Sequence, residues 1–201
     1  SMTALIFIDL ESNGLDQNAP GAELLELALV AIDPRTLQEI AHYTTPINAR
    51  CHTAEWDLYV VEMHQNSGLL QELRGPRAVL KVEAGGLPHV HQAEAIALQF
   101  MAQYAPVDAE GRGTSPMCGA NVGSFDRQWV RKFMPRLDKA FHYRCLDTNG
   151  AFLIEQHVFG LVSEKEVCGH RALSDARQSV DTLRKHAATL FEGYRVQGRV
   201  T

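Results

Sequence analysis

The chain has 201 residues, of which 45% are hydrophobic and 21% are charged, and this balance predicts one globular domain with a sizeable core. The formal net charge of −5 argues against the broad basic surface with which proteins hold long nucleic acids. A nucleic-acid ligand would therefore be short, or would be held through a metal and local contacts. No apolar run approaches the roughly 20 residues that a membrane-spanning helix needs, so no membrane association is expected.

Strand and helix signals follow one another along the whole chain. Strands are expected, in chain order, at 5–9, 24–33, 37–47, 117–121 and 143–146. Helices are expected at 54–63, 93–104, 124–134 (ended by Pro135), 148–157 and 173–190. The turn Asp33-Pro34-Arg35-Thr36 joins the second and third strands, and loops are expected at 74–88 and 107–116. This order predicts an α/β domain with an antiparallel meander at its start.

Ser1 stands before Met2, which is typical of a residue added for expression, so the domain is expected to span 2–201. The four cysteines are scattered without a C-x-x-C pair, which indicates neither a zinc site nor a disulfide framework. Reduced thiols and the lack of a signal peptide predict a cytoplasmic protein.

The first strand ends on two acidic residues, in Ala4-Leu-Ile-Phe-Ile-Asp-Leu-Glu-Ser-Asn-Gly-Leu15. Side chains alternate between the faces of a strand, so Asp9 and Glu11 project from one side while Leu10 points away. Two carboxylates held together there are costly unless a positive charge lies between them, and a divalent cation is the obvious candidate. The alternative is an edge strand with a solvated polar end.

Two further acidic residues stand at expected helix starts. Asp126 lies between a buried strand and a helix, where it could merely favour the helix dipole. Asp175 closes the segment Gly169-His-Arg-Ala-Leu-Ser-Asp175, which opens the last helix. Taken alone, Asp175 could also be a helix-start acid, and His170 could be an ordinary loop histidine.

Together, the four carboxylates and His170 can converge on the rim of one sheet, where α/β proteins place their sites. Four acids could hold two Mg²⁺ or Mn²⁺ ions roughly 3.5–4 Å apart, an arrangement that stabilises both the attacking and the leaving oxygen in phosphodiester cleavage. A histidine, with a reference pKa of about 6.5, can take a proton from the attacking water at neutral pH.

The order Asp9-Leu-Glu11, Asp126 and His170-x-x-x-x-Asp175 resembles the three-motif signature of the DEDDh 3′–5′ exonucleases, which share a ribonuclease H-like fold. Within that superfamily the chain most closely resembles the oligoribonucleases. Further matches cover most of the chain in the right order: His64-Gln-Asn-Ser-Gly-Leu69, Pro116-Met-Cys-Gly119, Lys132-Phe-Met-Pro135, Phe141-His-Tyr-Arg144 and Gly169-His-Arg-Ala-Leu-Ser-Asp-Ala-Arg-Gln-Ser-Val180. The resemblance implies a mixed α/β sheet, with an antiparallel meander followed by parallel strands, flanked by helices.

The resemblance also implies an activity: metal-dependent 3′–5′ hydrolysis of short single-stranded RNA to nucleoside 5′-monophosphates. Asp9, Glu11 and Asp175 would hold the ion that activates water. Asp9 would bridge to a second ion supported by Asp126, and His170 would be the general base. Each site would then hold two Mg²⁺ or Mn²⁺ ions.

Four residues would contact the substrate by the same resemblance. Leu15 corresponds to a residue that wedges between the terminal bases, and His64 to one that stacks on the 3′ base; a core leucine and a loop histidine are the alternatives. Tyr143 and Arg144 would come from the partner subunit of a homodimer and cap the 5′ phosphate of a dinucleotide. The planar guanidinium of Arg144 suits that task, although it could instead be a surface arginine at the start of a strand.

Some segments depart from the oligoribonuclease pattern. The stretch Asn121-Val-Gly-Ser-Phe before Asp126 differs in length and places Phe125 at a polar position, and extra residues lie near 17–21, 74–88 and 108–114. Insertions near the cleft could change the accepted strand length. The alternatives are an exonuclease acting on single-stranded DNA, a non-catalytic nucleic-acid-binding module, and a metal phosphoesterase acting on a small nucleotide. The intact acids and His170 favour catalysis.

Overall fold

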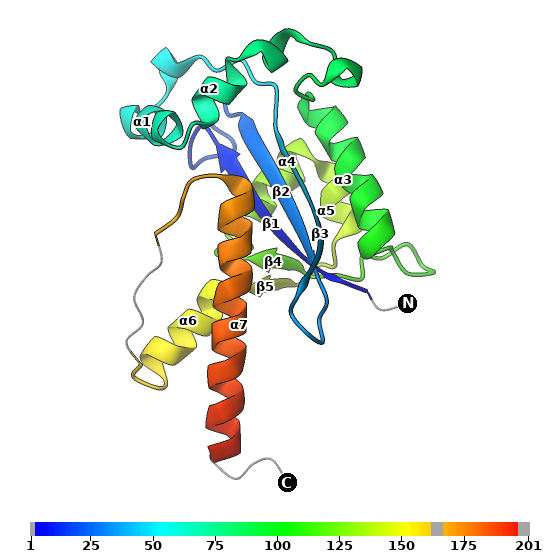
Figure 1. The fold of residues 1–201 in the computed structure, drawn as a ribbon, viewed down its shortest axis with the longest axis vertical. Coiled ribbons are helices and arrows are strands. Elements are labelled where there is room, and N and C mark those ends of the chain that lie inside the picture. Colours follow the sequence, from blue (N-terminus) through cyan, green and yellow to red (C-terminus); the bar gives the residue numbers. More distant parts are fainter. Residues whose placement is uncertain (1–2, 162–166, 197–201) are drawn as a thin grey trace.

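The computed structural model describes residues 3–161 and 167–196, which form a mixed five-stranded sheet with helices on both faces (Figure 1). The strand order is β3-β2-β1-β4-β5. The β1–β2 and β2–β3 pairs are antiparallel, and the β1–β4 and β4–β5 pairs are parallel, so the predicted meander and the parallel strands that follow it are confirmed. The strands are β1 (Leu5–Ser12), β2 (Leu24–Ile32), β3 (Glu39–Pro46), β4 (Met117–Gly119) and β5 (Cys145–Asp147).

The helices cover the two faces of the sheet and one of its ends. In the described part of the chain they are α1 (Leu58–Asn66), α2 (Leu69–Leu73), α3 (Val90–Tyr104), α4 (Asp126–Phe133), α5 (Pro135–Ala140), α6 (Thr148–His157) and α7 (Ala172–Val196). Three short 3-10 helices accompany them: η1 (Thr53–Glu55), η2 (Pro76–Val79) and η3 (Val82–Ala84). No helix among the described residues is both long and apolar enough to cross a bilayer.

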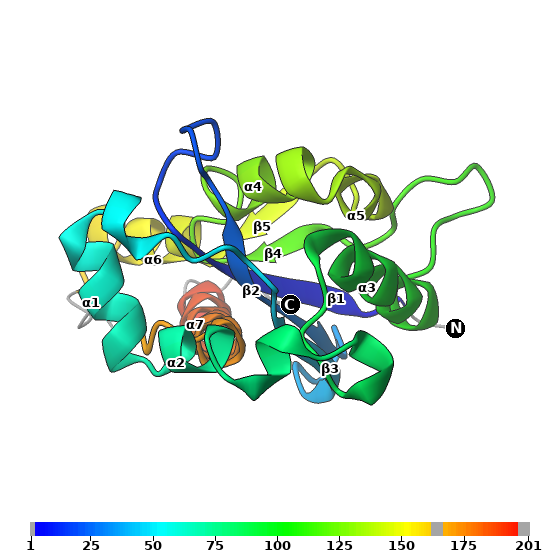
Figure 2. The ribbon, with the colours of Figure 1, turned by 90° about the horizontal axis from the view of Figure 1, so that it is seen from above.

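The side chains of β1 alternate between two cores. Ile6 and Ile8 pack into the core beneath α3, α4 and α5, whereas Phe7 packs on the other face with Ala172 and Ala176 of α7. Seen from above, α7 and α3 lie on opposite sides of the sheet (Figure 2). Residues two and four positions after Phe7 project toward the same face as Phe7, so the strand pattern directs two carboxylates toward the start of α7.

Several element boundaries differ from the sequence-based expectations for local reasons. The first strand extends to Ser12 because β2 continues beside it. The helix expected from residue 54 begins at Leu58, where the Asp57 side chain accepts a hydrogen bond from the Tyr59 backbone N at 2.8 Å and caps it. The strand expected at 143–146 spans Cys145–Asp147.

Two short helices, α2 and α5, were not expected from the sequence. Pro135 follows the end of α4 as expected, but it also opens α5 at the first helical position. Proline suits that position, because the amide hydrogen it lacks has no intrahelical partner there. Helix α2 has only five residues and packs Leu69, Leu70 and Leu73 into a small core with Leu25.

Candidate active site

The carboxylates identified in the sequence gather at the end of β1. Asp9 and Glu11 share the strand face that looks toward α7, and Asp175 lies in the first turn of that helix. Asp126 is the first residue of α4, and its Oδ1 accepts a hydrogen bond from the Leu10 backbone N at 3.2 Å. Segments more than a hundred residues apart in the chain thus meet at one corner of the sheet.

The metal-ligating atoms of Glu11, His170 and Asp175 lie within 4.8 Å of one another. Asp9 belongs to the same cluster, since the charges of Asp126, Glu11 and Asp175 all act on its carboxyl group. The structure therefore brings together the five residues that the three sequence motifs singled out. Such a set of hard oxygen donors with one imidazole fits Mg²⁺ or Mn²⁺.

Burial and mutual repulsion disfavour the charged forms of these acids. Burial, then the charges of Asp126 and Glu11, holds the pKa of Asp9 well above its usual range, and burial does the same for Asp126. Burial, followed by the charges of Asp175 and Glu26, raises the pKa of Glu11 to about 8. A divalent cation would reverse this balance, because it supplies the positive charge that the cluster lacks.

We expect the metal-free protein to lose stability as the pH rises from about 5 to about 8. The pKa of Glu11 rises from 4.5 to about 8 on folding, so the folded chain holds more protons than the unfolded chain across this window. Stability must then fall with increasing pH. In the presence of a chelator, the Tm should drop by at least about 5 °C across the window.

Glu11→Gln should flatten this dependence, whereas Glu83→Gln, at an exposed position on η3, should leave it unchanged. Thermal unfolding monitored at several pH values provides the measurement. A wild-type Tm that stays constant or rises between pH 5 and 8 would contradict the assigned electrostatics.

His170, two residues before the start of α7, has an unusual backbone conformation. Its φ of 54° lies in the left-handed region, which few residues other than glycine adopt. On one side, the Gly169 backbone N donates a hydrogen bond to Asp175 Oδ1 at 2.9 Å. The ring lines a hollow of about 290 Å³ together with Tyr59 and Met63 of α1. A histidine fixed beside carboxylates and open to a cavity can exchange protons with a bound molecule.

A larger cavity of about 650 Å³ adjoins the cluster and is lined by Glu11, Leu15, Trp56, Tyr59 and Phe125, among others. The Leu15 side chain is 86% exposed, so it is not a core leucine. Apolar and aromatic walls of this kind can hold the faces of nucleobases.

The loop that carries Leu15 is tied down at several points. The backbone N of Asn13 donates to the carbonyl of Glu23 at 3.1 Å, and the Asn13 side-chain Oδ1 accepts from the Glu23 backbone N at 2.8 Å. Lys132 of α4 donates to the Gln17 carbonyl at 2.5 Å. These bonds fix one wall of the cavity.

His64 and Tyr59, both on α1, differ sharply in exposure. His64 is fully buried, and its Nε2 lies 2.8 Å from the Ser12 carbonyl oxygen, so its ring face is not open to a base in this structure. Tyr59 is 67% exposed and lines both hollows beside the carboxylates. The aromatic surface available to a ligand is therefore that of Tyr59, which the sequence motifs did not single out.

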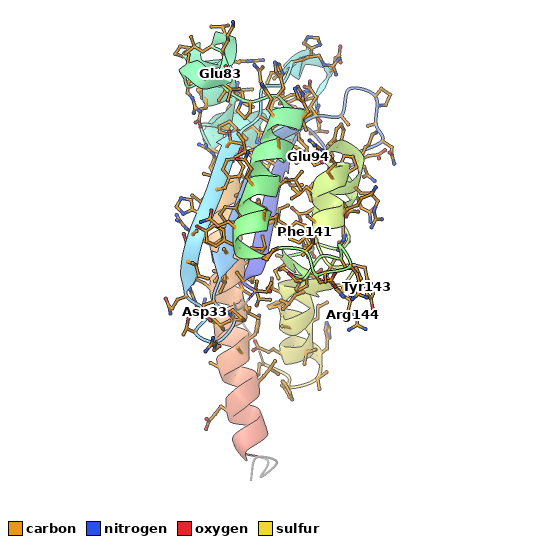
Figure 3. All side chains as sticks on the ribbon, turned by 90° about the vertical axis from the view of Figure 1, so that its right-hand side faces the viewer. Asp33, Glu83, Glu94, Phe141, Tyr143 and Arg144 are labelled. Atoms are coloured by element: carbon orange, nitrogen blue, oxygen red, sulfur yellow. The ribbon has the colours of Figure 1, made fainter. Side chains whose placement is uncertain are left out.

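Tyr143 and Arg144 lie away from their own chain's carboxylate cluster. Cys145 pairs with Met117, which in turn pairs with Ile6, so Arg144 is level with the start of β1. The level of Glu11 is then roughly 20 Å further along the strand direction. Both side chains project from the surface (Figure 3), and the Arg144 guanidinium lies 5.3 Å from the centre of the Tyr143 ring.

Glu26 and Arg171 join the site although neither was predicted to: Glu26 lies outside the three motifs, and Arg171 lies in the third but was given no role. Glu26 lies on β2 opposite Glu11, is buried, and accepts hydrogen bonds from the Arg171 side chain at 2.8 to 3.2 Å. The sequence did contain one indication of the role of Glu26: it is the single acidic residue in the otherwise apolar strand Leu24-Leu-Glu-Leu-Ala-Leu-Val-Ala-Ile32. A charged residue in such a strand needs a buried partner.

No protein-family model matches the sequence. The chain is 32% identical over 198 residues to the oligoribonuclease of Dichelobacter nodosus, an alignment that covers 93% of this chain and 94% of that protein. It is 28% identical over 194 residues to the probable oligoribonuclease of Dictyostelium discoideum, which covers 94% of this chain and 90% of that protein.

Among solved structures, zinc-bound E. coli exonuclease I in complex with single-stranded DNA aligns with 98% of this chain, with a TM-score of 0.63 and 13% identity. Exonuclease I of Methylocaldum szegediense aligns with 97% of this chain, with a TM-score of 0.62 and 15% identity. This chain spans 43% of the length of each of these two proteins. The similarity shows that the fold is ribonuclease H-like.

Proposed function

The chain belongs to the oligoribonuclease family, and from this premise we propose that it is a cytoplasmic 3′–5′ exonuclease. Its substrates are short single-stranded oligoribonucleotides, and its products are nucleoside 5′-monophosphates. The observation that carries the proposal is the meeting of Glu11, His170 and Asp175 within 4.8 Å, beside a cavity with aromatic walls. The carboxylate cluster with bound metal suits the phosphate of a nucleotide, and the adjoining cavity suits its base.

Asp9, Glu11, Asp126 and Asp175 would hold two divalent cations, and Asp9 would be a ligand of both. The raised pKa values of these acids support this assignment, because a buried cluster of like charges needs cations. When bound, Mg²⁺ or Mn²⁺ lowers the pKa of water and stabilises negative charge on the leaving oxygen. His170 accepts the proton of the attacking water as general base.

The cavity beside the cluster receives the bases at the 3′ end. Leu15 projects into it from a loop that Lys132 holds in place, and it wedges between the two terminal bases. We assign stacking on the 3′ base to Tyr59, since the ring of His64 is enclosed in the protein. Stacking is tolerant of base identity, so the cavity accepts any terminal base.

A test of this function compares RNA and DNA substrates of matched sequence, from dinucleotides to longer oligomers. The proposal expects RNA dinucleotides and other short RNAs to be hydrolysed fastest, with release of nucleoside 5′-monophosphates. RNA and DNA differ by the 2′-hydroxyl, so the sugar preference reports the contact that distinguishes them. Equal or better turnover of long DNA would replace the oligoribonuclease assignment with a DNA exonuclease.

We further propose that the active enzyme is a homodimer in which each subunit gives Tyr143 and Arg144 to the partner's site. Within one subunit the strand register keeps Arg144 far from Glu11. Tyr143 is itself 73% exposed, and a large aromatic side chain held in solvent in this way suits an interface between subunits.

Mixed dimers test this composite site. Asp9→Asn removes the subunit's own metal cluster but keeps its Arg144, whereas Arg144→Ala does the reverse. Dimers that combine the two variants contain one intact site, so co-expression should restore about a quarter of the wild-type activity if subunits pair at random. Activity no greater than the sum of the separate variants would exclude a shared site.

A further inference from the structure

Neighbouring residues hold His170 in its left-handed backbone conformation, and their importance for catalysis rests on the proposed role of His170. A non-glycine residue in this region is strained and persists only where the surrounding structure fixes it. The Gly169–Asp175 hydrogen bond restrains one side of His170. The other side is restrained by Arg171 and Ala172.

Arg171 is held by two carboxylates from two different elements. Its Nη2 lies 2.8 Å from Glu26 Oε1 and 2.7 Å from Glu72 Oε2, and its Nε lies 3.2 Å from both Glu26 oxygens. The Ala172 backbone N also donates to Glu26 Oε2 at 2.8 Å. The Glu26 carboxylate therefore binds the side chain of Arg171 and the backbone of Ala172, the two residues that follow His170.

Burying the charged carboxylate of Glu26 inside the protein costs free energy. Glu26 is buried on a central strand, directly opposite Glu11 in the register. A buried carboxylate is retained only when it is paired, and an apolar pair of similar size would serve stability as well or better. Stability alone therefore does not account for a buried Glu26 paired with the partly exposed Arg171, whereas fixing the geometry of the His170 segment does.

A second ion pair on α7 provides a comparison. Arg177 donates to both carboxylate oxygens of Glu39 on β3, at 2.9 and 3.0 Å. This pair also ties α7 to the sheet with bidentate geometry, but it is more exposed and lies six residues further along the chain than Arg171. It is thus a matched control for the structural effect of losing such a pair.

We propose that Glu26, Arg171 and Glu72 form a positioning clamp that fixes His170 in its left-handed conformation beside Glu11 and Asp175. These three are positioning residues and do not contact the substrate. The clamp links β2 and α2 to the start of α7, so the general base is set by two elements that lie outside the three sequence motifs.

The test compares Arg171→Gln and Glu26→Gln with Arg177→Gln and Glu39→Gln. The clamp variants should lower kcat roughly 10–100-fold while KM stays within about twofold. Hydrogen exchange at the Ala172 amide should become faster in the clamp variants only, and Arg171→Lys should recover part of both properties. Glu72→Gln removes the half-exposed carboxylate that also binds Arg171, so it should give a smaller loss of kcat. This variant provides the test if Arg171→Gln folds poorly.

Two results would overturn the clamp. One is a clamp variant whose kcat falls no further than that of its control in the Arg177–Glu39 pair. The other is unchanged exchange at Ala172 in a folded Glu26→Gln protein. Exchange is measured without metal or substrate, so it tests the clamp even if the wild-type enzyme does not cleave RNA. Conversely, active wild-type enzyme with an insensitive kcat in Arg171→Gln would refute the clamp and leave the proposed function intact.

Discussion

Asp9→Asn should abolish hydrolysis while making the metal-free protein more stable. Loss of a ligand shared by two cations removes several kcal/mol of charge stabilisation in the transition state, which corresponds to a decrease in kcat of about 10³-fold or more. The stability of the metal-free protein should instead increase, because burial and neighbouring negative charges raise the pKa of Asp9 well above its usual range. Asparagine cannot ionise, so without a cation the folded protein no longer has either to keep this side chain protonated or to bear the repulsion of its charge.

The measurements are the rate of cleavage of a labelled short RNA with Mn²⁺ and the Tm in a chelator. Asp33→Asn is the control, since Asp33 lies in the β2–β3 turn at the opposite end of the sheet (Figure 3) and should affect neither rate nor metal dependence. Cleavage by Asp9→Asn with ordinary Mn²⁺ dependence would overturn the assignment of the site. A lower Tm together with lost activity would instead point to a structural defect.

His170→Asn should lower kcat by roughly 10²–10⁴-fold and leave Mn²⁺ binding nearly intact. Asparagine is the informative replacement because it tolerates the left-handed backbone that His170 adopts. It keeps the conformation of the segment and removes the basic ring nitrogen. The four carboxylates remain, so the cations retain their main ligands.

Binding of Mn²⁺ by calorimetry and kcat from initial rates separate these two effects. His91→Asn, at an exposed position on α3, should change neither quantity. A large loss of Mn²⁺ affinity in His170→Asn would mean that this residue acts as a metal ligand. An unchanged kcat would remove it from the mechanism.

The sequence was informative where function depends on residue type at a fixed spacing. The alternation in β1 placed Asp9 and Glu11 on one face, and the buried strand before Asp126 and the helix after Asp175 are both present. The helix expected at 148–157 matches the bounds of α6, and the Asp147 side chain caps its start by accepting a hydrogen bond from the Asn149 backbone N. Local capping signals of this kind can be identified in a single sequence.

Contacts between distant residues could not be predicted in the same way. Arg171 and Glu26 are 145 residues apart, and nothing near either one in the chain identifies its partner. The solvent exposure of individual side chains was equally unpredictable. His64 and Tyr59 both lie on α1, and only the packing of that helix shows that the Tyr59 ring is exposed and the His64 ring is buried. Helix α5 was missed because Pro135 was interpreted only as the end of a helix.

A crystal structure with Mn²⁺ and a nucleoside 5′-monophosphate would test the central claim most directly. Anomalous scattering locates manganese independently of any assumption about the site. Two manganese peaks are expected among the carboxylates of Asp9, Glu11, Asp126 and Asp175. The phosphate of the nucleotide should lie against them, and its base should lie in the cavity beside Leu15. Manganese bound elsewhere, or a nucleotide whose phosphate lies away from these carboxylates, would contradict the claim.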